Sequence, residues 1–346
     1  MRYKLLGRSG LRVSEISLGA LTFGEGWGNG APKDVSRRIF DTYLDRGGNF
    51  IDTANKYIDG TSEEYVGEFI ADKRERIVLA TKYTLNMRPD DPNAGGNQRK
   101  NLVQSLEASL KRLRTDYVDL YWVHSWDYMT PVDEVMRALD DAVRAGKVLY
   151  VGISNTPAWI VSQANTLAEL RGWTRFVALQ IEYSLIERTP EREFLPMARA
   201  HDLAIAAWAP LAGGLLTGKY SGDAKRDEAV TRRMFMNNRF FTERNFGIAR
   251  ELGKIAREIG RPDAQVAINW VRRQKGVMVP IVGARTVEQI EQNLGCLDFE
   301  LDDDHLAQLN EVSRIPLGYP HEFTSIERIQ RGLYGDMLER IDNHRA

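Results

Sequence analysis

Four side chains that can transfer protons stand at or just beyond short apolar stretches of the sequence. Asp52, Lys82 and His124 each follow directly on such a stretch, and Tyr57 comes five residues after Asp52. A lone histidine after an apolar run is most often a buried structural residue. An aspartate, a lysine, a histidine and a tyrosine at the ends of neighbouring strands instead predict an active site.

Together these four residue types suit the reduction of a carbonyl group. Tyrosine is a weak acid, with an unperturbed pKa of about 10, and a nearby ammonium such as that of Lys82 lowers the pKa of the phenol. Asp52 can hold Lys82 charged, and a neutral His124 can donate a hydrogen bond to the substrate oxygen. None of the four residues supplies a hydride, so this chemistry requires a redox cofactor.

The elements that would position these residues alternate along the chain. Apolar runs predict eight strands, which are Glu15–Leu18, Asn49–Ile51, Ile77–Thr81, Val118–Val123, Val148–Gly152, Val177–Gln180, Ala204–Trp208 and Val277–Val282. Amphipathic helical patterns lie between them, for example in "QRKNLVQSLEASLKRLRTD" and "PVDEVMRALDDAVRAGK". Strands separated by helices pair in parallel, and eight such units predict an α/β fold with one (β/α)8 barrel (TIM barrel) domain over residues 1–346. The active site of such a barrel lies at the carboxyl ends of its strands.

Long loops and a C-terminal extension interrupt this alternation. Leu85–Asn97 predicts a loop after the third strand, and Gly213–Asn245 predicts a long insertion after the seventh. The tail Leu301–Ala346 is expected to be helical at first and irregular afterwards. Long loops in compact domains are usually functional or mobile. The candidate walls of a substrate pocket are Trp27, Trp126 and Tyr128, each of which could equally serve in ordinary loop packing.

Composition excludes several classes of partner. The chain has 47 Lys and Arg residues against 48 Asp and Glu, and the net charge of −1 gives no reason to expect nucleic acid or an anionic membrane as partner. The single cysteine, Cys296, cannot form an internal disulfide and fits a reducing compartment. No run is long and apolar enough for a signal peptide or a membrane span. We therefore expect a cytoplasmic protein with a small-molecule substrate; the oligomeric state stays open.

Other motifs in the chain give weaker signals. "GEGWGNGA" matches a dinucleotide-binding loop poorly, because no acidic residue closes a following strand at the right distance. "GGLLTGKY" resembles a phosphate-binding loop, but Tyr220 stands where a magnesium-binding Ser or Thr is required. The five histidines show no metal-ligand spacing, so no metal site is predicted. Asp302, Asp303 and Asp304 favour a helix N-terminus.

The sequence resembles the aldo-keto reductase family over most of its length. The motifs that carry the resemblance are "FIDTANKY", "LATKY", "DLYWVH", "GKVLYVGISN", "ALQIEYSL", "WAPLAGGLLTGKY" and "VGARTVEQIEQN". The branch it looks closest to includes bacterial sugar or aryl-alcohol reductases and the β-subunits of potassium channels. The resemblance implies an NADP(H)-dependent (β/α)8 barrel whose catalytic tetrad is Asp52, Tyr57, Lys82 and His124.

The resemblance also implies contacts with the cofactor. The implied cofactor contacts include Leu21 and Asp52. The implied binders of the nicotinamide carboxamide are Ser154, Asn155 and Gln180, with Trp208 stacked on the ring. The implied pyrophosphate contacts are Ala209, Pro210, Leu211, Gly213 and Lys219, and the implied adenosine contacts are Gly283, Arg285, Gln289 and Asn293. Asn155 could instead be a turn residue, and Gln180 and Trp208 could be core residues. Ala209 departs from many relatives, which have serine at this position.

Arg285 bears on the choice of cofactor. A guanidinium near the adenosine ribose can pair with a 2′-phosphate through two hydrogen bonds, which favours NADP(H) over NAD(H). Glu288 lies close by in the sequence and would oppose the phosphate. We expect NADP(H), and dual use of NAD(H) stays open.

Two functions from different classes fit the tetrad. The first is an enzyme that reversibly reduces the carbonyl of an aldehyde, ketone or sugar with a proton from Tyr57. The second is an NADPH-sensing regulatory subunit of a membrane protein with slow turnover. The resemblance favours the enzyme, although channel-associated relatives retain the same tetrad. Steady-state oxidation of NADPH with a panel of aldehydes separates the two.

Overall fold

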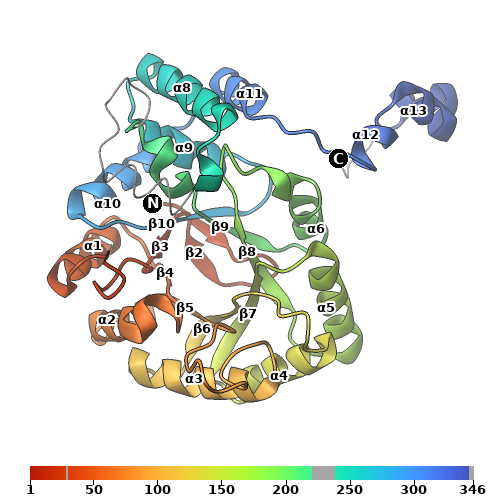
Figure 1. The fold of residues 1–346 in the computed structure, drawn as a ribbon. Helices are drawn as coiled ribbons and strands as arrows, with labels where there is room; N and C mark the ends of the chain where they lie inside the picture. Colours follow the sequence, from red (N-terminus) through yellow and green to blue (C-terminus); the bar gives the residue numbers. More distant parts are fainter. Residues whose placement is uncertain (29, 220–237, 343–346) are drawn as a thin grey trace.

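The barrel forms from eight parallel strands. The computed structural model describes residues 1–28, 30–219 and 238–342, and its strands close in the order β10-β3-β4-β5-β6-β7-β8-β9. The barrel strands are β3 (Ser17–Gly19), β4 (Phe50–Asp52), β5 (Val78–Tyr83), β6 (Val118–Val123), β7 (Val148–Ser154), β8 (Phe176–Glu182), β9 (Ala204–Trp208) and β10 (Met278–Val282). Each lies on one of the eight predicted strands, so the predicted (β/α)8 barrel is confirmed (Figure 1).

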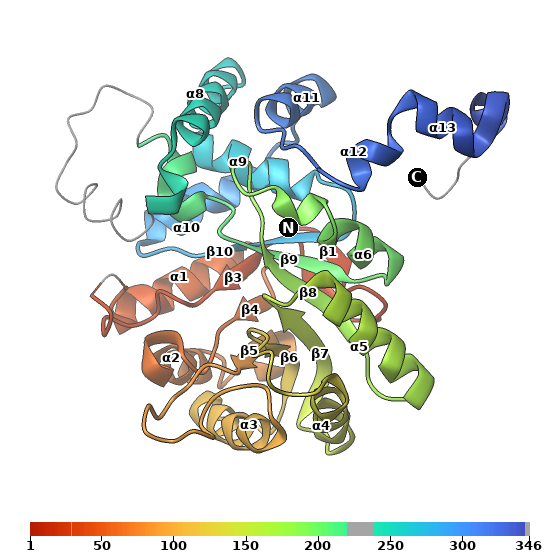
Figure 2. The same cartoon turned by 45° about the vertical axis from the view of Figure 1, so that its right-hand side comes forward.

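Helices surround the barrel and cover its strands on the outside (Figures 1 and 2). They are α1 (Lys33–Asp45), α2 (Thr61–Phe69), α3 (Arg99–Leu113), α4 (Val132–Arg144), α5 (Ala158–Arg171), α6 (Phe194–Ala200), α8 (Glu243–Glu258), α9 (Asp263–Arg272), α10 (Val287–Leu294) and α11 (Asp303–Val312). The apolar face of each amphipathic helix packs on the outer face of the strands in one continuous core. Asp302 caps α11, its side chain accepting from the His305 N–H, as its acidic run predicts.

Alternation along the strands decides which side chains enter the barrel. The interior holds its own apolar cluster, which includes Phe50, Val78, Ala80, Leu120, Trp122, Ala178, Ala204 and Ala206. Because successive side chains of a strand point to opposite faces, residues two positions further along face the same interior. Asp52, Lys82, His124, Gln180 and Trp208 therefore all project toward the barrel axis at its C-terminal end.

A hairpin that the sequence did not signal closes the opposite end of the barrel. Strands β1 (Tyr3–Leu5) and β2 (Arg12–Ser14) pair antiparallel. Leu6 and Val13 belong to the interior cluster, and Lys4 donates to the carbonyl of Met278 at the start of β10. The hairpin thus covers the N-terminal end of the barrel with apolar side chains.

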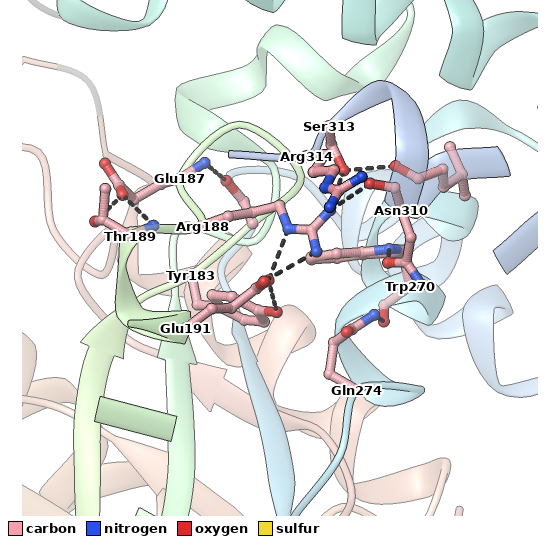
Figure 3. A network of polar contacts seen from close by, with 12 residues as sticks. Tyr183, Glu187, Arg188, Thr189, Glu191, Trp270, Gln274, Asn310, Ser313 and Arg314 are labelled. Atoms are coloured by element: carbon pink, nitrogen blue, oxygen red, sulfur yellow. Dashed lines mark hydrogen bonds and ion pairs between the residues drawn. The ribbon is translucent and has the colours of Figure 1, made fainter. Parts of the chain in front are cut away.

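A buried arginine fastens α11 to the loop that follows β8 (Figure 3). Arg188 donates to both carboxylate oxygens of Glu191, at 2.7 and 2.9 Å, and to Ser313 Oγ and the Asn310 carbonyl, each at 2.7 Å. Its guanidinium stacks 5.3 Å from the ring of Trp270. We call Tyr183, Arg188, Glu191, Trp270, Asn310 and Ser313 the Arg188 cluster.

The loops and the tail differ in part from the sequence predictions. Leu85–Asn97 is a loop, as predicted. The predicted insertion Gly213–Asn245 contains the end of the short 3₁₀ helix η4 (Ala212–Thr217), then η5 (Asn238–Phe240), and the first residues of α8; residues 220–237 lie outside the described part of the chain. After α11 the tail is irregular over residues 313–320, as predicted, but it then forms α12 (His321–Thr324), α13 (Glu327–Tyr334) and η7 (Gly335–Arg340). Residues 343–346 lie outside the described part of the chain.

Within the described residues, no helix combines the length and the apolar character that crossing a bilayer requires.

Candidate active site

A cavity of about 840 Å³ opens at the C-terminal end of the barrel. It extends from the ends of β4 and β6 across β9 to the loop after β10. Its lining includes Leu21, Trp27, Asp52, Tyr57, His124, Asn155, Gln180, Trp208, Ala209, Pro210, Leu211, Gly213, Lys219, Arg239, Phe240, Gly283, Arg285, Gln289 and Asn293. Most of the site residues predicted from the sequence therefore lie around one volume.

Lys82 is the buried centre of the cluster. Its ammonium donates to Asp52 Oδ2 at 2.5 Å, to the Thr53 carbonyl at 2.8 Å and to the Tyr57 hydroxyl at 3.0 Å. Its side chain is fully buried. Burial lowers the pKa of Lys82. The pKa is raised by a larger amount by the charge of Asp52, by the neighbouring Tyr57 and by the hydrogen bonds to both, so the net shift is upward. The amine stays protonated at neutral pH.

Tyr57 reaches the cavity from a strained turn. It begins the 3₁₀ helix η1 (Tyr57–Gly60), in which Ile58 and Asp59 have φ angles of 47° and 52°. A positive φ is unusual for a β-branched residue, and such strain persists where the surrounding structure holds it. The Trp27 indole donates to Asp59 Oδ2 at 3.2 Å and so ties this turn to the loop across the cavity.

The phenol of Tyr57 is a protonated group in this structure. Burial raises its pKa and outweighs the nearby ammonium of Lys82, which lowers it. The sequence-based expectation of a lowered pKa is thus wrong in its net direction, because desolvation of the phenolate dominates. Since the oxygen of Tyr57 accepts from Lys82, its own proton remains available to another acceptor in the cavity.

His124 is a neutral imidazole beside this phenol. Burial, followed by the charge of Lys82, lowers the pKa of His124 to about 3. The rings of His124 and Tyr57 meet edge to face, with centroids 5.9 Å apart. Among the described residues, His124 Nδ1 has no hydrogen-bond partner. A neutral ring at the cavity wall can donate one hydrogen bond to a ligand oxygen.

Hydrogen bonds connect the ends of the neighbouring strands around the cavity. Gln180 donates to Asp52 Oδ1 at 2.9 Å, so the carboxylate is held by an amide as well as by Lys82. Asn155, which has a φ of 44°, donates to the His124 carbonyl at 2.9 Å, and the Trp208 indole donates to Asn155 Oδ1 at 3.3 Å. These contacts fix the amides and the indole on one wall.

The backbone after β9 forms the next part of the wall. Ala209, Ala212, Gly213 and Gly214 have φ angles of 52°, 49°, 63° and 100°. The N–H groups of Ala212 and Gly214 donate to the carbonyls of Ala209 and Leu211 within this turn. Successive N–H groups in a turn can form a concavity that suits anions. Lys219 lies beyond this turn on the same cavity. At the far end, the Arg285 N–H donates to Gln289 Oε1 at 2.9 Å, and Asn293 donates to the Gly283 carbonyl at 3.3 Å.

These residues fit an extended nicotinamide dinucleotide. The lining of the cavity includes residues of the buried tetrad, the turn at 209–214 and Arg285. These three parts suit a nicotinamide, a pyrophosphate and an adenosine, respectively. Ser154 Oγ is buried and has no partner among the described residues, which is costly unless a ligand pairs with it.

Some sequence expectations about the site differ from the structure. Asp52 and Lys82 lie inside β4 and β5 rather than beyond their ends. Trp27 lines the cavity, but Trp126 and Tyr128 do not, and Tyr128 is exposed. The sequence also missed the second acceptor of Lys82, the Thr53 carbonyl, for which it holds no signal because every residue has a carbonyl.

Arg239 is another residue that the sequence did not indicate. Its guanidinium donates to both carboxylate oxygens of Glu182, at 2.9 Å each, and it lines the cavity. It lies 57 positions from Glu182 in the chain, so no local pattern could have paired them. In the part of the chain that is described, no group of three or more His, Cys, Asp or Glu side chains could hold a metal ion.

Comparison with known proteins gives one consistent result. Residues 15–314 match the aldo/keto reductase family. The chain is 37% identical over 342 residues to a norsolorinic acid reductase of Emericella nidulans, covering 96% of this chain and 86% of the relative. It is 37% identical over 335 residues to an aryl-alcohol dehydrogenase (NADP(+)) of Phanerodontia chrysosporium, covering 90% and 86%. A putative aryl-alcohol dehydrogenase of Saccharomyces cerevisiae is 34% identical, covering 92% and 88%.

Proposed function

Since the chain belongs to the aldo/keto reductase family and is an NADP-dependent oxidoreductase, we propose that it reversibly reduces aldehydes or ketones with Tyr57 as the proton donor. The observation that carries the proposal is the contact of 3.0 Å between Lys82 Nζ and the Tyr57 hydroxyl at the wall of the cavity. NADPH, when bound, supplies the hydride to the carbonyl carbon. The residues of the barrel then have to orient the carbonyl and give its oxygen a proton.

Tyr57 and Lys82 divide the work of proton transfer. Tyr57 is protonated before the reaction, and its proton points away from Lys82 because its oxygen accepts from the ammonium. When the phenol gives up the proton, Lys82 stabilises the phenolate at hydrogen-bond distance. Asp52 and Gln180 hold Lys82 in this position through the carboxylate. General acid catalysis of this kind contributes roughly 10²–10⁴ to the rate.

His124 positions the carbonyl oxygen. A neutral imidazole donates one hydrogen bond without adding a positive charge that would compete with the proton of Tyr57. We assign Asn155, Gln180 and Ser154 to the carboxamide of the nicotinamide, because amides and a hydroxyl can donate and accept together. Trp208 would stack on the nicotinamide ring, and the turn at 209–214 with Lys219 would hold the pyrophosphate.

We propose NADP(H) as the preferred cofactor because of Arg285. A guanidinium can bind a 2′-phosphate through two hydrogen bonds, which Gly283, Gln289 and Asn293 cannot do. Replacing Arg285 by Met would raise the KM for NADPH more than the KM for NADH. Equal changes for both cofactors would show that Arg285 does not read the phosphate.

We further propose an aryl aldehyde or aryl ketone as substrate, in the same barrel domain. Trp27 adds an aromatic wall to the cavity that Tyr57 and His124 also line, and aromatic rings favour flat partners. Two of the relatives are named as aryl-alcohol dehydrogenases, one of them putatively. Comparing kcat/KM for benzaldehyde derivatives and for sugars of similar size tests this preference.

The decisive test is Tyr57→Phe beside the matched variant Tyr183→Phe. We expect Tyr57→Phe to retain NADPH binding, followed by quenching of tryptophan fluorescence, and to lose about 10²–10⁴ in kcat. Tyr183→Phe removes the same hydroxyl outside the cavity and should keep kcat. Turnover of an aryl aldehyde by Tyr57→Phe at the wild-type rate contradicts the mechanism. If the wild-type protein binds NADPH but reduces no aldehyde, the result would instead favour the alternative function, an NADPH-sensing regulatory subunit of a membrane protein.

A further inference from the structure

The C-terminal arm, residues 321–342, projects from the barrel and has no buried side chain. Figures 1 and 2 show α12 and α13 standing away from the other helices, in dark blue. No residue of α12, α13 or η7 is buried. Its exposed apolar side chains are Phe323, Ile326, Leu333, Tyr334, Met337, Leu338 and Ile341. An apolar surface of this size on a protruding helix marks an interaction site.

The root of the arm is held in place by the barrel. The Arg188 cluster fixes the end of α11, and Arg192 donates to the Pro316 carbonyl at 2.9 Å. Arg244 donates to the Ser313 carbonyl at 2.8 Å. The chain therefore leaves the barrel in a defined direction, and at the start of the arm His321 contacts Glu193 at 3.2 Å.

An apolar groove lies beside this root. It has a volume of about 680 Å³ between the start of α5, the end of β8 and α6. Its apolar lining includes Pro157, Trp159, Ile181, Pro190 and Phe194, and Trp159 is 66% exposed. Its carboxylates are Glu182, Glu187 and Glu193. Arg239 pairs with Glu182, which reduces the charge of the groove.

We propose that the arm of each copy occupies the groove of a second copy, which gives a twofold-symmetric dimer. Both surfaces belong to this chain. A single twofold rotation therefore places the arm of each copy in the groove of its partner, so that both arms and both grooves are buried. His321, the first residue of the arm, lies 3.2 Å from Glu193 of the groove, so arm and groove share one side of the molecule. The arm points away from its own groove, and a partner's arm can fill it.

The length of the arm is sufficient for a stable interface. Specific interfaces take roughly 20–30 residues from each partner, and here each partner would contribute residues of its arm (321–342) together with residues that line its groove. Each dimer would contain two such contacts. Aromatic and large aliphatic side chains, which the arm and groove both present, are typical of the centre of an interface.

The contact between a partner's arm and the groove would also lie next to the active site. Asn155 lines both the groove and the cofactor cavity. A partner's arm in the groove therefore lies behind the residue that accepts from Trp208 and donates to the His124 carbonyl. The dimer itself does not depend on the proposed chemistry, because no residue of the tetrad takes part in it.

The first experiment measures the mass of the full chain by light scattering after size exclusion. We expect a mass near twice 39.3 kDa at micromolar concentration. Leu333→Asp on the arm and Trp159→Asp in the groove should each halve it. Leu170→Asp is the matched control, because this leucine is 79% exposed at the end of α5 and outside the groove. Circular dichroism and NADPH binding show that each variant is folded.

Mixing the two variants distinguishes arm exchange from other dimers. A protomer with Leu333→Asp keeps its groove, and a protomer with Trp159→Asp keeps its arm, so the mixture can form one intact contact and recover part of the dimer. Contact between two arms, or between two grooves, would not be restored by mixing. A monomeric wild-type protein, or a dimer that persists in both variants, overturns the proposal. A monomer whose own groove protects the arm from proteolysis would show that the arm folds back.

Discussion

Two buried clusters in this protein use the same three kinds of residue to different ends. At the cavity, Lys82 contacts Asp52 and Tyr57; in the Arg188 cluster, Arg188 and Tyr183 both contact Glu191. Each is therefore a cation, a carboxylate and a phenol in close contact. The difference lies in the hydrogen bond that the phenol makes.

The direction of that hydrogen bond separates a reactive phenol from a structural one. The Tyr183 hydroxyl donates to Glu191 Oε1 at 2.7 Å, so its proton is already engaged (Figure 3). Burial and the adjacent carboxylate raise the pKa of Tyr183. The Tyr57 hydroxyl instead accepts from Lys82, which leaves its proton for a ligand and places a cation beside the oxygen that would become negative. The composition of a buried cluster thus says less about function than its pattern of donors.

The largest effect should come from removing the two cations, one in each cluster. Lys82→Met and Arg188→Met both leave a carboxylate without its cation, and each should lower the free energy of unfolding by up to about 3–5 kcal/mol. Only Lys82→Met should also lower kcat, by about 10²–10⁴, because the phenolate of Tyr57 loses its stabilising charge. Urea unfolding and steady-state kinetics measure the two quantities. Comparable losses of kcat in both folded variants would erase the distinction between the clusters.

The imidazole of His124 has no counterpart in the Arg188 cluster and should make stability depend on pH. The pKa of His124 falls from an ordinary value of 6.5 to about 3 on folding, so the unfolded chain binds the additional proton between these values. Stability is then lost as the pH falls through this window, by up to about 1.4 kcal/mol per pH unit.

His124→Gln removes this titration and should flatten the curve relative to the wild type. Urea unfolding at a series of pH values between 7 and 4 gives the difference between the two proteins, in which the contributions of shared carboxylates cancel. A difference that stays constant with pH would mean that the imidazole is not held neutral by the fold.

The smallest effects on stability and on NADPH binding are expected from replacing two buried serines, Ser313 and Ser154, by alanine. Ser313 Oγ accepts from Arg188 at 2.7 Å and donates to the Leu309 carbonyl at 2.5 Å, whereas Ser154 Oγ has no partner among the described residues. Ser313→Ala should lower the free energy of unfolding by about 1–3 kcal/mol and leave NADPH binding unchanged. Ser154→Ala should leave stability unchanged or raise it, and weaken NADPH binding roughly 2–12-fold. Fluorescence titration and urea unfolding of the same samples test both, and identical behaviour of the two variants would contradict the assignment of Ser154.

The sequence was sufficient for the barrel and for the place of the tetrad. Parallel strands with both faces buried are continuous apolar runs, and these are visible without any knowledge of the fold. The rule that active sites lie at the carboxyl ends of barrel strands then selects Asp52, Lys82 and His124. Tyr57 followed from its place in the loop after the second strand, although the strained turn that carries it left no pattern in the sequence.

The rest depended on contacts between distant parts of the chain. Arg188 and Ser313 are 125 positions apart, and Gln180 and Asp52 are 128 apart, so neither pair leaves a periodic signal. The net direction of the pKa shift of Tyr57 was also beyond the sequence, because it depends on how much water the surrounding side chains exclude. The helices of the C-terminal arm were missed because they are short, the longest being α13 with eight residues, and so few residues give only a weak periodic signal.

The register of the central strands has a practical consequence. Lys82 pairs with Trp122 across β5 and β6, and a slip of one residue would turn the ammonium from the barrel axis into the apolar helix layer. The turnover per mole of protein therefore reports the fraction of molecules in which β5 has the correct register. Specific activity, compared between preparations of equal purity, would reveal a misassembled fraction that mass, solubility and overall helical content do not detect.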